Sequence, residues 1–246
     1  MSFSHGRTAR FLVGGFDLSD TTKQVNTEGT NELVDITGFQ NTQKRFLGGL
    51  KSGKVSANGL WSGTADGRYA AVSSDIADEN YGAGTLCISH YPAGDTVGNK
   101  GWATLCTETG WNFGSDVNEA VTYSLEGESS IGKEPVVSHF AIGDARTLAY
   151  NTSGTATVVD NSAATTNGAA GYLHNFQISA GTCAVKIQHS SDNSTYVDLI
   201  TFSNVTTADP RVSERIAASG TVNRYTRCVY TMTGGSASFH AGLARL

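Results

Sequence analysis

The residues that could support catalysis are scattered along this chain. Its six histidines stand singly, and the sequence contains no nucleophile elbow, P-loop, dinucleotide-binding loop or zinc-protease helix motif. Catalysis needs a nucleophile, a base and a stabilising group brought together, so this pattern predicts a protein that is not an enzyme. We interpret the histidines as strand or surface residues: His5, His90, His139, His174, His189 and His240.

Two acidic groups could hold a metal ion, but neither has a persuasive spacing. Asp75, Asp78 and Glu79 fall in a helix candidate, where a solvated face is the commoner explanation. The segment from Asp192 to Asp198 lacks the glycine and final glutamate of an EF-hand loop, which favours a hairpin turn. The cysteines lie far apart in apolar runs, which predicts buried free thiols and no zinc site: Cys87, Cys106, Cys183 and Cys228. We expect no metal and no cofactor.

The most suggestive cluster of charges is basic. Residues 41–54 are predicted as a loop in which four positive charges surround a Phe-Leu-Gly-Gly tip. One interpretation is a solvated loop. The other is a docking arm that meets the acidic surface of a neighbouring copy, and its residues would be Lys44, Arg45, Phe46, Leu47, Lys51 and Lys54.

The acidic excess of the chain lies entirely in its first part. Residues 1–133 contain 10 Lys and Arg against 15 Asp and Glu, which gives −5, and residues 134–246 contain 7 of each. An acidic surface repels nucleic-acid phosphates, which argues against a protein that grips DNA. It suits a surface that DNA passes without sticking, although ordinary solubility charge explains it equally well.

Composition and periodicity predict an all-β chain in two parts. The 29 glycines and 3 prolines suit many tight turns. Strand-like runs in the first part cover 84–91, 101–108 and 120–127, and in the second part 172–178, 185–189 with 196–202, 222–232 and 237–243. The single helix candidate is Asp66–Glu79. A break at Gly132-Lys133-Glu134-Pro135 predicts one domain at 1–133 and a second, jelly-roll-like antiparallel β-sandwich at 134–246.

The tryptophans Trp61, Trp102 and Trp111 all lie in the first part. Exposed tryptophans could stack on sugars, but alternating strands favour a place in the core or at a subunit contact. No apolar run reaches the roughly 18 residues of a membrane span. Residues 1–10 are polar and lack a signal core, so we expect synthesis in a cytoplasm and no membrane partner.

The order of elements in residues 1–133 resembles that of the tail tube (major tail) proteins of long-tailed bacteriophages. The features that carry this resemblance are Phe-Asp-Leu-Ser after Gly14-Gly15, the strand at 33–39, the arm at 44–54, Asn-Gly-Leu-Trp at 58–61, the helix at 66–79 and Tyr-Ser-Leu-Glu-Gly at 123–127. The second part resembles β-sandwich domains appended to phage tail proteins. Its distinctive features are Gln-His-Ser-x-Asp at 188–192 and Arg-Tyr-x-Arg at 224–227.

The resemblance implies a structural virion protein. Such subunits have a tail-tube-like β-sandwich or barrel with one short helix, and form hexameric rings whose sheets join into a continuous inner barrel. The rings stack around a tape-measure protein, with tail initiator and terminator proteins as further partners, and double-stranded DNA passes through an electronegative lumen without specific binding. The arm would then contact the neighbouring ring, and residues 134–246 would decorate the outside of a virion tail made in a bacterial cytoplasm.

Two alternatives share the β-sandwich. One is a capsid decoration protein, and the other is a carbohydrate-binding module that attaches to a host surface. The second part contains no tryptophan, which weakens the carbohydrate-binding alternative.

Overall fold

A computed structural model of the chain describes residues 6–61, 86–129, 136–144, 154–209 and 211–246. The predicted all-β class is confirmed: these residues form β-strands and one short 3-10 turn, η1 (Gly6–Thr8). Every pair between the described strands is antiparallel. The predicted helix at 66–79 lies outside the described residues.

The first part of the chain supplies the strands from β1 to β7, and the second part begins with β8. Their bounds are β1 (Arg10–Val13), β2 (Phe16–Asp17), β3 (Thr22–Asp35), β4 (Phe46–Leu60), β5 (Leu86–Tyr91), β6 (Lys100–Gly114), β7 (Thr122–Ser129) and β8 (Val136–Asp144). The runs predicted at 84–91, 101–108 and 120–127 are confirmed as β5, β6 and β7, although β6 continues six residues further to Gly114.

The second part supplies the remaining strands. Their bounds are β9 (Gly154–Thr155), β10 (Val159–Asp160), β11 (Ala169–Ile178), β12 (Thr182–Ser190), β13 (Val197–Thr201), β14 (Val205–Thr206), β15 (Ser213–Ala218), β16 (Tyr225–Met232) and β17 (Ala237–Arg245). The predicted hairpin of 185–189 with 196–202 is confirmed by the pairing of β12 with β13.

The prediction of a loop at residues 41–54 is wrong for most of its length. Strand β4 begins at Phe46 and pairs with β3 from Asp35 down to Thr22. Glycine-rich segments have low intrinsic strand preference, but a partner strand of matching length supplies the backbone hydrogen bonds that local sequence does not indicate. Only residues 36–45 connect the two strands, so the predicted loop is one side of a long hairpin.

One shared sheet contributes strands to two apolar cores. The first packs between β1, β4, β5, β6 and β7, and includes Phe11, Val55, Ile88, Trp102 and Leu125. The second packs between β11, β12, β16 and β17, with members such as Leu173, Ile187, Cys228, Phe239 and Leu243. One 11-stranded sheet reaches both cores because β8 pairs with β6 on one side and β17 on the other. A six-stranded sheet around β12 and β16 covers the second core.

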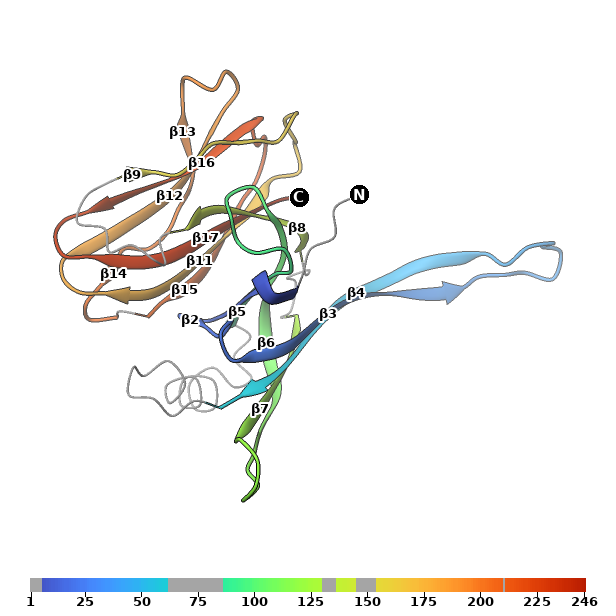
Figure 1. The fold of residues 1–246 in the computed structure, drawn as a ribbon. Helices are drawn as coiled ribbons and strands as arrows, with labels where there is room; N and C mark the ends of the chain where they lie inside the picture. Colours follow the sequence, from blue (N-terminus) through green and yellow to red (C-terminus); the bar gives the residue numbers. More distant parts are fainter. Residues whose placement is uncertain (1–5, 62–85, 130–135, 145–153, 210) are drawn as a thin grey trace.

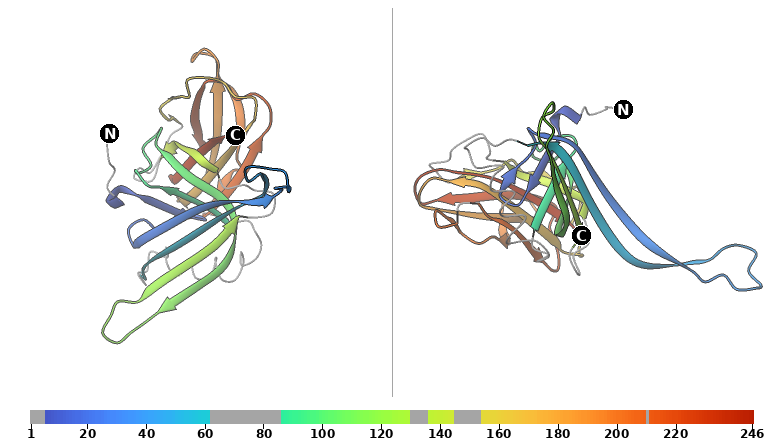
Figure 2. Two further views of the ribbon diagram at one scale, coloured as in Figure 1. Left: turned by 90° about the vertical axis from the view of Figure 1, so that its right-hand side faces the viewer. Right: turned by 90° about the horizontal axis from the view of Figure 1, so that it is seen from below.

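Two hairpins project from this body. The hairpin of β3 and β4 extends far beyond the other strands, away from the β-sandwich of the second part (Figure 1). The view from below shows the same arrangement (Figure 2, right). The hairpin of β6 and β7 projects separately, and its two strands continue the sheet formed by β3 and β4.

Candidate functional site: an acidic sheet face and a projecting arm

Strands β3, β4, β7 and the second half of β6 form a four-stranded sheet with two different faces. Alternate residues of β4 and β7 are buried, and Val55, Ala57, Tyr123 and Leu125 all belong to the first core. This alternation is what a strand with one apolar and one solvated face produces. The opposite face of the same sheet is therefore available to solvent.

The solvated face is polar and acidic, and we call it the acidic sheet face. One row across it consists of Glu28, Lys54 and Glu128, which are cross-strand neighbours, and Glu126 lies in the next row. The Lys54 ammonium is 3.3 Å from the Glu126 carboxylate. Three acids against one base leave these two rows with a net charge of −2. Other members of the face are uncharged polar residues, among them Asn26, Ser56, Asn58, Ser124 and Asn112.

Both edges of this sheet are open within the described chain. Strand β3 pairs only with β4, and residues 107–114 of β6 pair only with β7. An open edge presents unpaired backbone N–H and C=O groups, which makes it a template for pairing with another chain. Both edges are long, and each is a strand of the same antiparallel sheet.

The arm is the part of the β3–β4 hairpin at residues 29–53, where β4 has β3 as its only described partner. All but Gly53 of its residues are exposed. A two-stranded ribbon alone cannot bury its side chains, so large apolar residues remain in solvent: Leu33, Val34, Ile36, Phe39, Phe46, Leu47 and Leu50. Monomeric proteins rarely expose such a run, and exposed runs of this kind are commonly found at interaction surfaces.

The predicted arm residues fall at different places along this hairpin. Lys44 and Arg45 lie in the connecting loop, Phe46 and Leu47 begin β4, and Lys51 lies in its middle. The loop base is closed by hydrogen bonds: the Arg45 N–H donates to Thr37 Oγ1 at 2.9 Å, and the Ile36 N–H donates to the Arg45 carbonyl at 2.9 Å.

Lys54 belongs to the acidic sheet face. Its ammonium group is paired with Glu126 of the same chain, so its place is at the root of the arm and away from the tip. A role for these six residues in docking stays a prediction.

The tryptophans divide between the core and the surface. Trp102 is buried in the first core, as predicted. Trp111 is 45% exposed and lies 4.9 Å, between ring centroids, from Phe113, which in turn lies 4.7 Å from Trp61. These three rings form a partly exposed aromatic cluster on the β6–β7 hairpin.

A serine and a histidine are brought together where the two parts of the chain meet. Ser89 Oγ and His174 Nε2 are 2.9 Å apart, and His174 Nδ1 is 2.7 Å from the Gly14 carbonyl oxygen. A carbonyl only accepts, so Nδ1 carries the proton and Nε2 accepts from the serine hydroxyl. Burial lowers the pKa of His174 to about 4, so the ring is neutral near pH 7. Both side chains are fully buried, and a substrate cannot reach them.

A second buried histidine makes a similar connection. His240 Nε2 on β17 is 2.8 Å from the Tyr91 hydroxyl on β5. Sequence reasoning treated each histidine singly, and no signal in the sequence links residues 85 or 149 positions apart. These contacts tie the second part of the chain to the first.

Glu108 is a further residue that sequence reasoning missed. It is 2% exposed, and neither of its carboxylate oxygens has a hydrogen-bond partner within the described chain. Burial raises the pKa of Glu108 to about 7. On β6 every second residue points into the core, and Glu108 continues the inward-facing series of Trp102 and Cys106. The sequence signal that could have found Glu108 is therefore an acid at an inward-facing position of a strand.

The segment at Asp192–Asp198 is a hairpin turn, as predicted. The Asp192 carboxylate accepts hydrogen bonds from the Ser194 and Thr195 N–H groups at 2.9 and 2.8 Å, and these lower its pKa. The Gln-His and Arg-Tyr-x-Arg motifs contribute to a surface network. Arg227 donates two hydrogen bonds to Gln188, whose amide donates to Asp198. The four cysteines are free and buried, as predicted.

The described part of the chain contains no helix long and apolar enough to cross a membrane. Within the same residues, no group of three or more His, Cys, Asp or Glu side chains is arranged to hold a metal ion.

No family model matches the chain, and no curated protein matches it. Solved structures do resemble it. A chain from the virion of a native gene transfer agent particle is 15% identical, with 54% of this chain and 98% of that chain covered and a TM-score of 0.41. The SPP1 tail tube, determined by solid-state NMR and cryo-EM, is 8% identical, with 54% and 78% covered and a TM-score of 0.41.

The SPP1 Dit protein, a hub of the adsorption apparatus of phages that infect Gram-positive bacteria, resembles the chain over more of its length. It is 12% identical, with 96% of this chain and 99% of that chain covered and a TM-score of 0.36.

Proposed function

We propose that this chain is a structural subunit of a phage-type tail, and that copies of it join side by side into rings which stack into a tube. The observation that carries this proposal is the four-stranded sheet, which has no further strand at either edge among the described residues and is acidic on its solvated face. A structural role also fits the Ser89–His174 pair, because both side chains are fully buried.

The two open edges suit a head-to-tail ring. The sheet is antiparallel throughout. Strand β3 of one copy can therefore pair antiparallel with the free side of β6 in the next copy, and this pairing continues the sheet. In such a ring, β3 of each copy pairs with one neighbour and β6 pairs with the other neighbour. A heterologous contact of this kind generates a closed ring when the rotation between copies closes. Six copies, as in the resemblance, would make a continuous barrel with no free edge left.

In such a barrel the acidic sheet face lines the lumen, because the opposite face packs on the core of each subunit. Glu28, Glu126 and Glu128 would then repeat around the channel. Repulsion between these carboxylates and the phosphates of double-stranded DNA would let DNA pass without binding. The sandwich of the second part lies on the other side of the molecule from the arm, which supports a place outside the tube (Figure 2).

The arm supplies the contact between rings. Its exposed apolar side chains lose their contact with water only when another subunit covers them, and Lys44 and Arg45 at its end carry the charge that would meet an acidic neighbour. A tape-measure protein inside the tube, with initiator and terminator proteins at its ends, completes the proposed set of partners. The proposed location is the virion tail, after synthesis in the host cytoplasm.

Sedimentation velocity and negative-stain electron microscopy test this proposal. The wild-type protein should sediment as species heavier than the monomer as its concentration rises, and micrographs should show rings and hollow tubes. Arg45→Glu should keep rings and abolish tubes, while Arg45→Lys, which keeps the charge, should form both. Monomers at every concentration would contradict self-assembly, and rings that never stack would point to a single-ring hub.

A further inference from the structure

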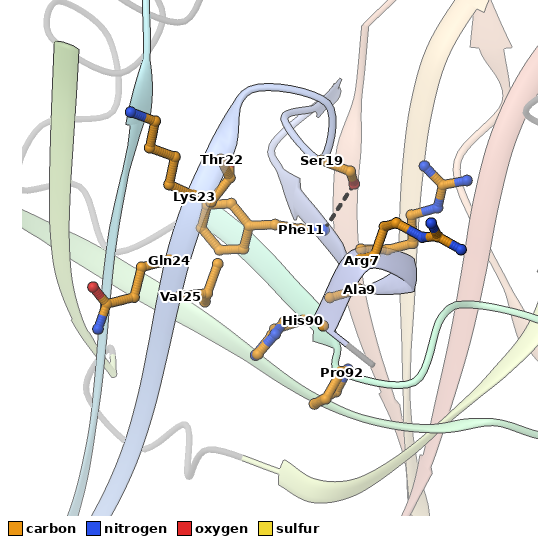
Figure 3. Close-up of a pocket in the computed structure, with 12 residues that line it drawn as sticks. Arg7, Ala9, Phe11, Ser19, Thr22, Lys23, Gln24, Val25, His90 and Pro92 are labelled. Carbon is orange, nitrogen blue, oxygen red and sulfur yellow. Dashed lines mark hydrogen bonds between the residues drawn. The ribbon is translucent and has the colours of Figure 1, made fainter. Parts of the chain in front are cut away.

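A basic pocket lies between the start of β3, the start of β1 and the end of β5 (Figure 3). Its volume is about 480 Å³. The charged side chains among its described lining residues are all basic, namely Arg7, Arg10 and Lys23. Arg10 lies 3.6 Å from the carboxylate of Asp95, whereas Lys23 has no ion-pair partner within the described chain. At Lys23 the pocket therefore presents a positive charge that no described ion pair balances.

The floor of the pocket is apolar and contains one polar atom without a partner. Phe11, Val25 and Pro92 line it together with His90 (Figure 3). His90 is 9% exposed, and its Nδ1 has no hydrogen-bond partner among the described residues. Burial lowers the pKa of His90 to about 4, so the ring is neutral at pH 7 and can offer an N–H to an acceptor. A carboxylate on a short apolar segment would satisfy both features.

The β6–β7 hairpin ends in a segment with this chemistry. Its loop contains Asp116, Val117 and Glu119, and Val117 is 99% exposed. The loop is held in a turn, because the Asn118 N–H donates to the Asp116 carboxylate at 2.9 Å and the Glu119 N–H donates to the Asp116 carbonyl at 3.3 Å. An apolar side chain is thus displayed between two acids. We call residues 115–119 the acidic tip.

The strand register places the acidic tip and the basic pocket at the same end of the sheet. Thr22 pairs with Gly59, Gly59 pairs with Tyr123, and Tyr123 pairs with Phe113. The pocket adjoins Thr22, and the tip begins two residues beyond Phe113. When β6 of one copy lies antiparallel beside β3 of the next, the tip of the first copy reaches the start of β3 in its neighbour.

We propose that the basic pocket receives the acidic tip of a second copy of this chain. Val117 would occupy the apolar floor, and Asp116 and Glu119 would face Lys23 and Arg7. This inference rests on the proposed side-by-side ring, and it adds a side-chain contact that holds neighbouring subunits together. Charge complementarity across a partly desolvated contact fixes the register of two edges that backbone pairing alone leaves free to slide.

Charge-reversal variants of the full-length protein test this contact between the acidic tip and the basic pocket. Asp116→Lys combined with Glu119→Lys should raise the concentration needed for rings at least tenfold, and so should Lys23→Glu. Rings should return when the two kinds of variant are mixed, because each then offers a complementary pair. If the tip variant assembles like the wild type, or if mixing never restores rings, the proposed contact does not exist even though the ring itself stands.

A peptide experiment tests the pocket without any ring. The octapeptide of residues 113–120, Phe-Gly-Ser-Asp-Val-Asn-Glu-Ala, should shift the NMR signals of His90 and Lys23 when it is added to the full-length protein below the concentration at which rings form. A control peptide with lysine at both acidic positions should leave these signals unchanged. If inorganic phosphate produces the same shifts and the peptide shows no advantage over it, the pocket is a plain anion site and the inference fails.

Discussion

Replacing Glu108 by glutamine should stabilise the protein, and the gain should depend on pH. The Glu108 carboxylate is buried in the first core without a described hydrogen-bond partner, and burial raises its pKa from 4.5 to about 7. The Glu108 carboxylate therefore binds a proton more tightly in the folded state than in the unfolded state. Stability from this group is complete below pH 4.5 and is lost as the pH rises to about 7.

The size of the effect follows from the two pKa values. A difference of about 2.5 pH units corresponds to about 3 kcal/mol at roughly 1.4 kcal/mol per unit. Glu108 lies beside the open edge of β6, where solvent screens part of this cost, so we expect Glu108→Gln to gain about 2 kcal/mol at pH 8. The gain should shrink toward zero at pH 4.

Urea unfolding followed by circular dichroism, at concentrations too low for assembly, measures this difference at each pH. The free energy of unfolding must be compared between variant and wild type at each pH. The lowered pKa values of His90 and His174 make the stability of both proteins rise with pH over an overlapping range, and this contribution cancels in the difference. Glu28→Gln, on the solvated face of the same sheet, is the matched control and should change stability little at any pH. A gain for Glu108→Gln that does not vary between pH 4 and pH 8 would refute this reasoning.

Two further predictions concern the stability of the isolated subunit. Gly59→Ala should cost about 2 kcal/mol in urea unfolding, because the new methyl group would overlap the Thr21 carbonyl oxygen and lie 2.8 Å from the Tyr123 ring; an unchanged midpoint would show that β3 and β4 separate easily at this point. The buried neutral ring of His174 has a pKa lowered from 6.5 to about 4, so its contribution is complete above pH 6.5 and falls by up to about 3 kcal/mol as the pH drops to 4. His174→Gln should flatten the stability profile over that interval, and a slope equal to that of the wild type would contradict the assignment.

The sequence predicted the elements in which one face is buried and the other solvated. Residues 121–127 alternate because Tyr123 and Leu125 enter the core while Glu126 faces solvent, and this period of two is visible in any single strand. The hairpin of β12 and β13 was predicted for the same reason, with a polar turn between two alternating runs.

The elements that the sequence did not reveal depend on partners far away in the chain. The part of β4 at 46–53 is exposed on both faces, so its sequence shows no alternation of apolar and polar residues. It forms a strand because its backbone pairs with β3. Strands β8 and β15 were not predicted, and β8 takes its place between β6 and β17, which are far apart in sequence. The contacts of His174 and His240 arise from the same long-range packing.

The sequence suggested a docking arm that includes the basic and apolar residues at 44–47, and that role stays a prediction. The acids of the sheet face could not be chosen from sequence, because only the register aligns Glu28, Lys54 and Glu128 in one row. The basic pocket was not predicted either, since it combines residues from η1, β1, β3 and β5.

Cryo-electron microscopy of the assembled protein tests the central claim most directly. We expect a hollow tube of stacked rings in which β3 of each subunit pairs with β6 of the next, and in which Glu28, Glu126 and Glu128 line the channel. An assembly in which these two edges stay unpaired, or in which the acidic sheet face points away from the channel, would contradict it.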